Sequence, residues 1–187
     1  SDERVEKIVS TANYYGYSGS RVKGLIFCSN KREGAALSEK FNQRGLRTIF
    51  LSGDDSQQAR ENAVSRLIAE ENDPNRLDYI LTVDIFNEGV DIPEINQVIM
   101  LRPTESAIIF VQQLGRGLRK AEGKEFVVIL DFIGNYESNY LIPVALSGDR
   151  TGNKDNIRRH LMSGDAVIKG VSSIYFDEIA KKRIFQS

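Results

Sequence analysis

The chain has 187 residues, of which 41% are apolar and 27% charged, with 25 Lys and Arg against 26 Asp and Glu. These proportions suit one soluble domain with its own core, and they exclude a disordered chain, a collagen and a coiled coil. One cysteine and one histidine exclude an internal disulfide and a zinc site built from Cys and His.

No apolar run approaches the roughly 20 residues that cross a bilayer, and the first residues lack the apolar stretch of a signal peptide. The sequence therefore predicts a cytoplasmic protein. Its charge is unevenly spread, since residues 102–187 carry 13 Lys and Arg against 10 Asp and Glu, whereas residues 1–101 carry 12 against 16. The mildly basic second half is modest support for a polyanionic partner.

Apolar residues at helical spacing predict a first helix at residues 3–15. A strand at 24–28 follows, and Ser29 and Asn30 can cap a helix over 31–44 that ends at Gly45. Further strands are predicted at 48–51, 77–82, 97–101 and 126–130, and further helices at 56–70 and 106–114. Continuously apolar strands separated by helices predict a mainly parallel sheet covered on both faces. We therefore expect a three-layer α/β domain over residues 1–140, with residues 141–187 as a C-terminal extension that packs on it or leads into a further domain.

The ends of the predicted strands are the first place to look for a functional site, because open α/β sheets bind ligands beyond the carboxyl ends of their strands. The residues at those positions are Ser29 and Asn30, Ser52 and Gly53, Thr82 to Asp91, Arg102 and Asp131.

The segment from Thr82 to Pro93 leaves a buried strand and holds three acidic residues and a glycine. One interpretation is a polar connection with a glycine turn. The other is a ligand site in which Gly89 allows close approach of the backbone and Asp91 accepts a hydrogen bond from a sugar hydroxyl. The residues of this segment alone leave both interpretations open.

The segment from Gln112 to Lys120 carries two arginines, Arg116 and Arg119, in a glycine-containing turn near the end of a predicted helix. Basic side chains at a helix C-terminus are also favoured by the helix dipole, so a solvated surface is the alternative. Two guanidinium groups three residues apart can clamp phosphate oxygens bidentately, which is the geometry that an arginine finger needs.

Taken together, four segments resemble the second RecA-like motor domain of superfamily 2 helicases and translocases. Residues 24–30 resemble motif IV, residues 52–60 the segment that carries a Gln and an Arg, residues 82–93 motif V, and residues 112–119 motif VI. The four occur in the family's order over residues 22–132, and three of them include or directly follow the end of a predicted strand.

This resemblance implies a role for each matching residue. Arg116 and Arg119 would face the γ-phosphate of ATP held by a partner domain, with Arg119 as the finger. Gly89, Asp91, Glu88 and Gln112 would lie on the nucleotide side. The nucleic-acid backbone would be contacted by Ser29, Asn30, Gly53, Arg60 and Thr82, with Arg60 bonding either to Asp84 or to a phosphate. Backbone contacts of this kind position a strand without reading its sequence.

Departures from the family pattern favour the DNA-directed branch. Ser52 stands where a histidine is usual, and Gln113 and Leu118 replace the Arg and Gly of many DEAD-box proteins. The chain is more similar to restriction motor subunits and to XPB-like and UvsW-like helicases. Residues 172–178 resemble the region after the motor in bacterial helicases that carry an N-terminal phospholipase D-like nuclease.

The sequence contains no G-x-x-x-x-G-K-[ST] loop, and no DExx-type acidic pair follows any of the predicted strands, so the half of an ATPase site that holds ATP and Mg²⁺ is expected in an N-terminal RecA-like domain of the same protein. We expect Asp54 and Asp55 to be a solvated turn, and Cys28 to be a packed apolar group. The alternative function is a non-catalytic α/β docking module that binds nucleic acid or a nucleotide.

Overall fold

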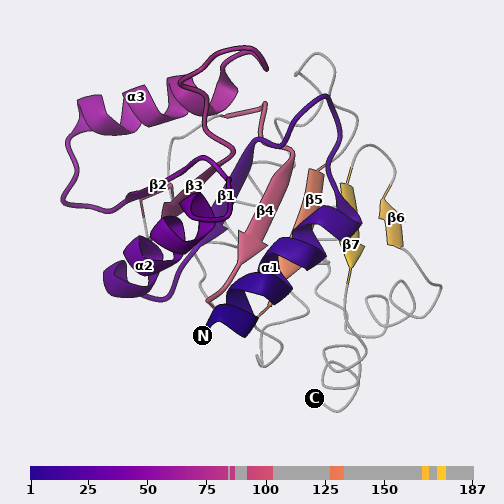
Figure 1. The fold of residues 1–187 in the computed structure, drawn as a ribbon. Helices are drawn as coiled ribbons and strands as arrows, with labels where there is room; N and C mark the ends of the chain where they lie inside the picture. The colour runs from indigo at the N-terminus through magenta and orange to yellow at the C-terminus, as the bar shows by residue number, and fades with distance from the viewer. Residues whose placement is uncertain (84, 87–91, 103–126, 133–165, 169–171, 176–187) are drawn as a thin grey trace, which may run out of the picture.

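A computed structural model describes residues 1–83, 85–86, 92–102, 127–132, 166–168 and 172–175 (Figure 1). The elements in these ranges are α1 (Asp2–Tyr15), β1 (Gly24–Phe27), α2 (Lys31–Asn42), β2 (Thr48–Leu51), α3 (Gln57–Ile68), β3 (Tyr79–Thr82), β4 (Gln97–Met100), β5 (Val127–Asp131), β6 (Ala166–Ile168) and β7 (Ser172–Tyr175). None of the helices in these ranges is long and apolar enough to span a membrane. The helix predicted at 106–114 lies outside the described residues.

The strands form one sheet in the order β2-β3-β1-β4-β5-β7-β6. All neighbouring pairs run parallel except β6 and β7, which are antiparallel. The predicted mainly parallel α/β sheet is therefore confirmed. Strands β6 and β7 belong to the segment assigned to the C-terminal extension, and β7 pairs with β5. The boundary at residue 140 stays a prediction.

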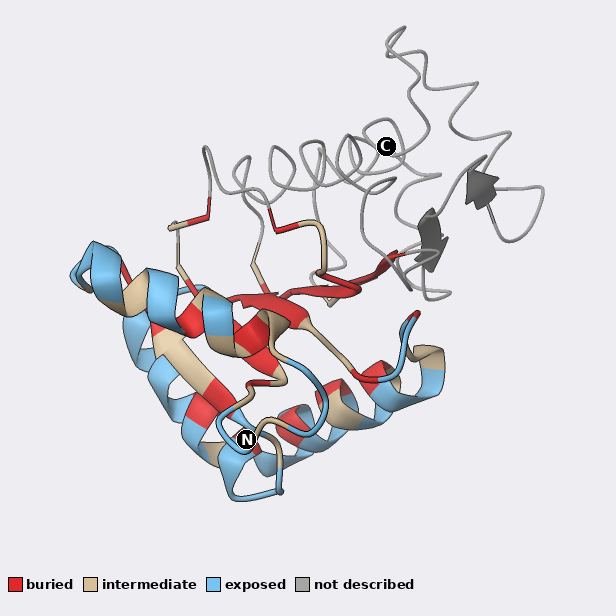
Figure 2. Ribbon diagram, turned by 90° about the horizontal axis from the view of Figure 1, so that it is seen from above, coloured by how far each residue is buried: buried red, intermediate tan, exposed pale blue. Residues whose placement is uncertain are grey.

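Helices cover both faces of the sheet. Alternate residues of β1 point to opposite sides, so Leu25 and Phe27 pack in one apolar cluster with Leu67 of α3, whereas Ile26 packs in a second cluster with residues of α1 and α2 such as Ile8. Buried residues therefore lie along the strands and on one side of each helix (Figure 2). This arrangement of helix, sheet and helix is the expected three-layer architecture.

Local hydrogen bonds set the ends of these elements. The Asn30 side chain accepts from the backbone N–H of Glu33 at the start of α2, and Ser56 does the same for Ala59 at the start of α3. Strand β3 begins two residues later than predicted because Leu77 bonds elsewhere: its N–H donates to the carbonyl of Arg66 near the end of α3. Leu77 thus ties β3 to α3 and is not part of the strand ladder.

Helix α1 is held on the sheet by a buried amide. The Gln97 Nε2 donates to the carbonyls of Ala12 and Gly16 at 3.1 and 2.8 Å, and the Tyr79 hydroxyl donates to the Gln97 Oε1 at 2.5 Å. Tyr79 is 5% exposed, so this bond fixes its ring inside the core. The ring lies over Gly24 of the neighbouring strand, where an added Cβ would be 2.3 Å from the Tyr79 Cδ1.

We expect Gly24→Ala to lower the free energy of unfolding by about 1–3 kcal/mol, because the methyl group would overlap a ring that cannot move away. Urea denaturation measures the change. The matched control is Gly53→Ala, where a Cβ would have no atom within 4 Å, and it should stay within about 0.5 kcal/mol of the wild type. Equal stability of the two variants would contradict the packing described for Gly24.

Candidate functional site

The carboxyl ends of the central strands lie level with one another. Phe27, the last residue of β1, is paired with Thr82 of β3 and with Met100 of β4. Thr82 is in turn paired with Leu51, the last residue of β2. The segments that follow β1, β2 and β3 therefore leave the sheet at one edge, and this brings together the predicted site residues that follow these strands.

At the end of β1, the predicted contacts Ser29 and Asn30 are exposed at the start of α2. The backbone N–H of Ser29 donates to the Glu33 Oε2 at 2.8 Å, and the Arg4 guanidinium of α1 donates to the other oxygen of that carboxylate. Burial alone would raise the pKa of Glu33, but the hydrogen bonds from Ser29 and the interaction with Arg4 hold it below its ordinary value. Glu33 thus stays ionised, and it remains hydrogen-bonded to the backbone N–H of Ser29, which is one of the predicted site residues.

At the end of β2, Ser52 and Asp55 close a tight turn around Gly53. The Ser52 N–H donates to the Asp55 Oδ2 at 2.7 Å, and the Asp55 N–H donates to the Ser52 carbonyl at 3.2 Å. The Gly53 carbonyl accepts from the Arg60 Nη2 at 2.9 Å. Arg60 therefore braces the turn from α3, and this contact joins two of the predicted backbone-binding residues.

Gly53 itself is exposed and surrounded by open space. An added Cβ would meet no atom within 4 Å. Packing inside the described part of the domain therefore does not require a glycine at this position. The open space leaves room for a ligand to come close to the backbone.

Thr82 differs from the other predicted contacts because it is 0% exposed. Among the described residues its Oγ1 has no hydrogen-bond partner, and the same is true of the Arg60 Nε, which is also buried. Unsatisfied buried polar atoms are costly and uncommon. The role of Thr82 in contacting nucleic acid stays a prediction, and this structure does not present its side chain to solvent.

An ion pair that the sequence did not suggest joins two of these segments. Lys31, the first residue of α2, contacts the carboxylate of Asp54, which follows Gly53. Because β3 lies between β1 and β2 in the sheet, this contact passes over the end of β3. The Lys31 and Asp54 side chains remain 57% and 78% exposed. The turn that was expected to be solvated thus contains two acidic residues with different contacts. Asp55 closes the turn, and Asp54 pairs with Lys31 of the other segment.

Cys28 directly follows the last residue of β1 and lies inside the core. It is 0% exposed, and burial raises the pKa of its thiol to about 12. A protonated, inaccessible thiol is neither a nucleophile nor a metal ligand. The interpretation of Cys28 as a packed apolar group is therefore confirmed.

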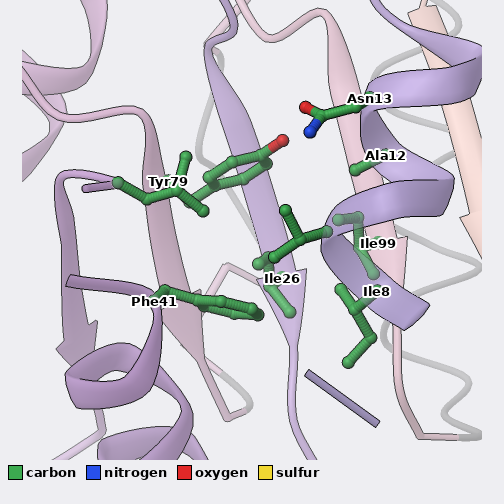
Figure 3. Close-up of a pocket in the computed structure, with 9 residues that line it drawn as sticks. Ile8, Ala12, Asn13, Ile26, Phe41, Tyr79 and Ile99 are labelled. Carbon is green, nitrogen blue, oxygen red and sulfur yellow. The ribbon is translucent and has the colours of Figure 1, made fainter. Parts of the chain in front are cut away.

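A narrow apolar cavity lies between α1, α2 and the sheet (Figure 3). Ile8 of α1, Phe41 of α2, Ile26 of β1 and Tyr79 of β3 line it, with no Lys, Arg, Asp or Glu among its lining residues. A cavity lined almost entirely by apolar side chains offers too few polar groups to replace the hydration of a phosphate. It belongs to the packing of α1 and α2 on the sheet and not to the strand-end site.

A match to a model of a protein family shows which family the chain belongs to. The model, described as the helicase conserved C-terminal domain, matches residues 4–121. The chain belongs to this family. The expected resemblance to superfamily 2 helicases is therefore confirmed, and the strand ends described above are those of a helicase C-terminal domain.

Two proteins from yeast and Escherichia coli are similar in sequence to this helicase C-terminal domain. It is 28% identical over 178 residues to the Saccharomyces cerevisiae protein "Putative ATP-dependent helicase IRC3", covering 95% of this chain and 24% of that protein. It is 32% identical over 116 residues to the Escherichia coli "Type I restriction enzyme EcoKI endonuclease subunit", covering 57% of this chain and 10% of that protein. The chain thus spans about a quarter or less of the length of these relatives.

Solved structures share the fold of this helicase C-terminal domain. The yeast DEAD-box splicing factor Prp28 matches with a TM-score of 0.58 at 18% identity, covering 99% of this chain and 35% of that one. The C-terminal domain of the DEAD-box protein Dbp5 matches with a TM-score of 0.53 at 17% identity, covering 98% of this chain and 91% of that one. The RecA-like fold is therefore confirmed.

The remaining predicted site residues lie outside the described residues. They are the two arginines Arg116 and Arg119 and the four residues assigned to the nucleotide, Gly89, Asp91, Glu88 and Gln112. Asp84, the predicted partner of Arg60, also lies outside them. Their roles stay predictions.

Proposed function

We propose that this chain is the second motor domain of an ATP-dependent DNA helicase or translocase. It supplies arginine fingers and contacts to the nucleic-acid backbone. The observation that carries the proposal is the level carboxyl edge of the sheet, where Ser29 and Asn30 follow β1 and Gly53 follows β2, the two strands on either side of β3, in a member of the helicase C-terminal domain family. Exposed hydroxyl, amide and backbone groups suit phosphate contacts that carry no sequence information.

ATP hydrolysis in this proposal needs a second domain. The sequence has no loop that could cradle the β- and γ-phosphates. An N-terminal RecA-like domain of the same protein would hold ATP and Mg²⁺, and this chain would complete the site with Arg116 and Arg119, while Gly89, Asp91, Glu88 and Gln112 would face the nucleotide. Hydrolysis would then depend on closure of the two domains.

Closure links the nucleotide to the strand. Binding of ATP would shut the cleft and bring the arginines to the γ-phosphate, and hydrolysis would release them. The groups at the carboxyl edge of the sheet would move with this domain. Alternating grip by the two domains would then advance the nucleic acid.

Sequence features favour DNA as the substrate. Ser52, Gln113 and Leu118 depart from the pattern of many DEAD-box proteins. The similarity to a restriction endonuclease subunit points the same way.

The test is ATP hydrolysis by the protein that carries this chain with its N-terminal motor domain, in the presence of duplex DNA, single-stranded DNA or RNA. We expect DNA to stimulate turnover, RNA to stimulate it less, and the 187-residue chain alone to be inactive. Stimulation by RNA alone would overturn the choice of DNA. A protein that hydrolyses no ATP with any nucleic acid would instead be the docking module.

Gly53→Ala tests the backbone contacts separately from folding. The added methyl group meets nothing inside the described part of the domain, so only a ligand that approaches the Gly53 backbone would feel it. We expect about a tenfold loss of DNA affinity, measured by fluorescence anisotropy, with the urea midpoint unchanged. Unchanged affinity would show that DNA does not approach this turn.

A further inference from the structure

The cationic and amide groups at the carboxyl edge of the sheet are already paired with carboxylates of this chain. Glu33 accepts from the Ser29 N–H at 2.8 Å, and Asp55 accepts from the Ser52 N–H at 2.7 Å. Lys31 is paired with Asp54. Each carboxylate thus pairs with a donor that could otherwise bind a phosphate oxygen.

The three carboxylates are not held equally. Glu33 also binds Arg4 and is 16% exposed, and Asp55 closes the β2 turn through the backbone of Ser52. Both are part of the local fold. Asp54, by contrast, is 78% exposed and reaches Lys31 from the opposite segment.

A contact between two exposed side chains of this kind contributes little to stability and exchanges readily with other charges. Lys31 adjoins Asn30 in the chain, and Asp54 adjoins Gly53. The pair therefore lies between the two segments that carry the proposed backbone contacts.

We propose that Lys31 binds a backbone phosphate of the nucleic acid and that Asp54 is its intramolecular competitor. In the free domain the Asp54 carboxylate forms an ion pair with the Lys31 ammonium. An incoming phosphodiester takes its place, and Asp54 turns to solvent. This inference rests on the proposed function and adds to it a cation that the family resemblance did not assign, together with a residue that lowers affinity.

The competition has a consequence for salt dependence. A lysine released to a phosphate displaces a condensed counterion from the nucleic acid, which steepens the dependence of affinity on salt. Removing Asp54 leaves Lys31 free for the phosphate and removes a negative charge beside it. Removing Lys31 should lower the affinity for the nucleic acid and make the dependence of that affinity on salt less steep.

The experiment measures binding of the 187-residue chain to fluorescein-labelled oligothymidylate and to a labelled DNA duplex over a series of salt concentrations. We expect Asp54→Asn to raise affinity about fivefold at low salt and Lys31→Gln to lower it by a similar factor with a salt slope smaller by about one. In the Lys31→Gln background, Asp54→Asn should have much less effect. The matched control is Asp2→Asn, which removes another exposed carboxylate paired with a lysine, Lys40, and makes the same change in net charge.

Each outcome decides the proposal. Equal effects of Asp54→Asn and Asp2→Asn, with binding by the wild type intact, would overturn the competition and leave the proposed function standing. Additive effects of the Lys31 and Asp54 substitutions would also overturn it. Absence of binding by the wild type to any DNA would overturn the proposed function and this inference with it.

Discussion

The Arg119→Ala variant of the complete motor protein is expected to hydrolyse ATP about 10³-fold more slowly than the wild type in the presence of DNA. The reason is electrostatic, because the guanidinium would neutralise the charge that develops on the transferred phosphoryl group. Loss of an interaction that is made only in the transition state lowers kcat and leaves the binding of ATP largely unchanged. Steady-state ATPase assays with saturating DNA measure the effect.

Two further variants sharpen this result. Arg119→Lys keeps the charge but loses the planar, bidentate fork, so we expect it to recover only a small part of the lost turnover. Arg44→Ala removes an arginine whose neighbours are Asp2 and Glu6 of α1, and it should leave turnover unchanged. If Arg119→Ala also left stimulated turnover unchanged, motif VI would not supply a finger, and the docking module would become the better interpretation.

The second large effect is expected from Arg21, which lies in the segment between α1 and β1. Its side chain is 6% exposed and donates to backbone carbonyls of Leu67 and Ala69 at the end of α3 and of Leu77 before β3. Burial lowers the pKa of Arg21, and Asp78 partly opposes this. An arginine remains protonated despite such a shift. Arg21 therefore acts as the C-terminal cap of α3.

We expect Arg21→Ala to lower the free energy of unfolding by about 3 kcal/mol, since it leaves several carbonyls without a donor in a place that water reaches poorly. Urea denaturation followed by circular dichroism measures the loss. Arg44→Ala is again the comparison, because its ion pairs lie at the surface and should contribute no more than about 1 kcal/mol. Equal losses in the two variants would contradict the capping role of Arg21.

The elements of this domain were largely predictable because their signals are local. Apolar runs such as Leu25 to Phe27 indicated buried strands, and Asn30 indicated a helix start that the structure confirms. The rule that ligands bind beyond the carboxyl ends of parallel strands then selected Ser29, Asn30 and Gly53, and the register of β1, β2 and β3 brings their segments to one edge.

The sequence by itself determined the α/β class, the parallel strands and the family, because periodicity, capping residues and motif order are all properties of neighbouring residues. The tertiary structure alone decided which strands are neighbours, that β7 pairs with β5, and that Thr82 is buried. It also paired Lys31 with Asp54, 23 residues apart, and directed Arg21 to carbonyls 46 to 56 residues away. Contacts at such separations depend on strand order and helix placement, and these follow from packing the whole core and not from any local pattern.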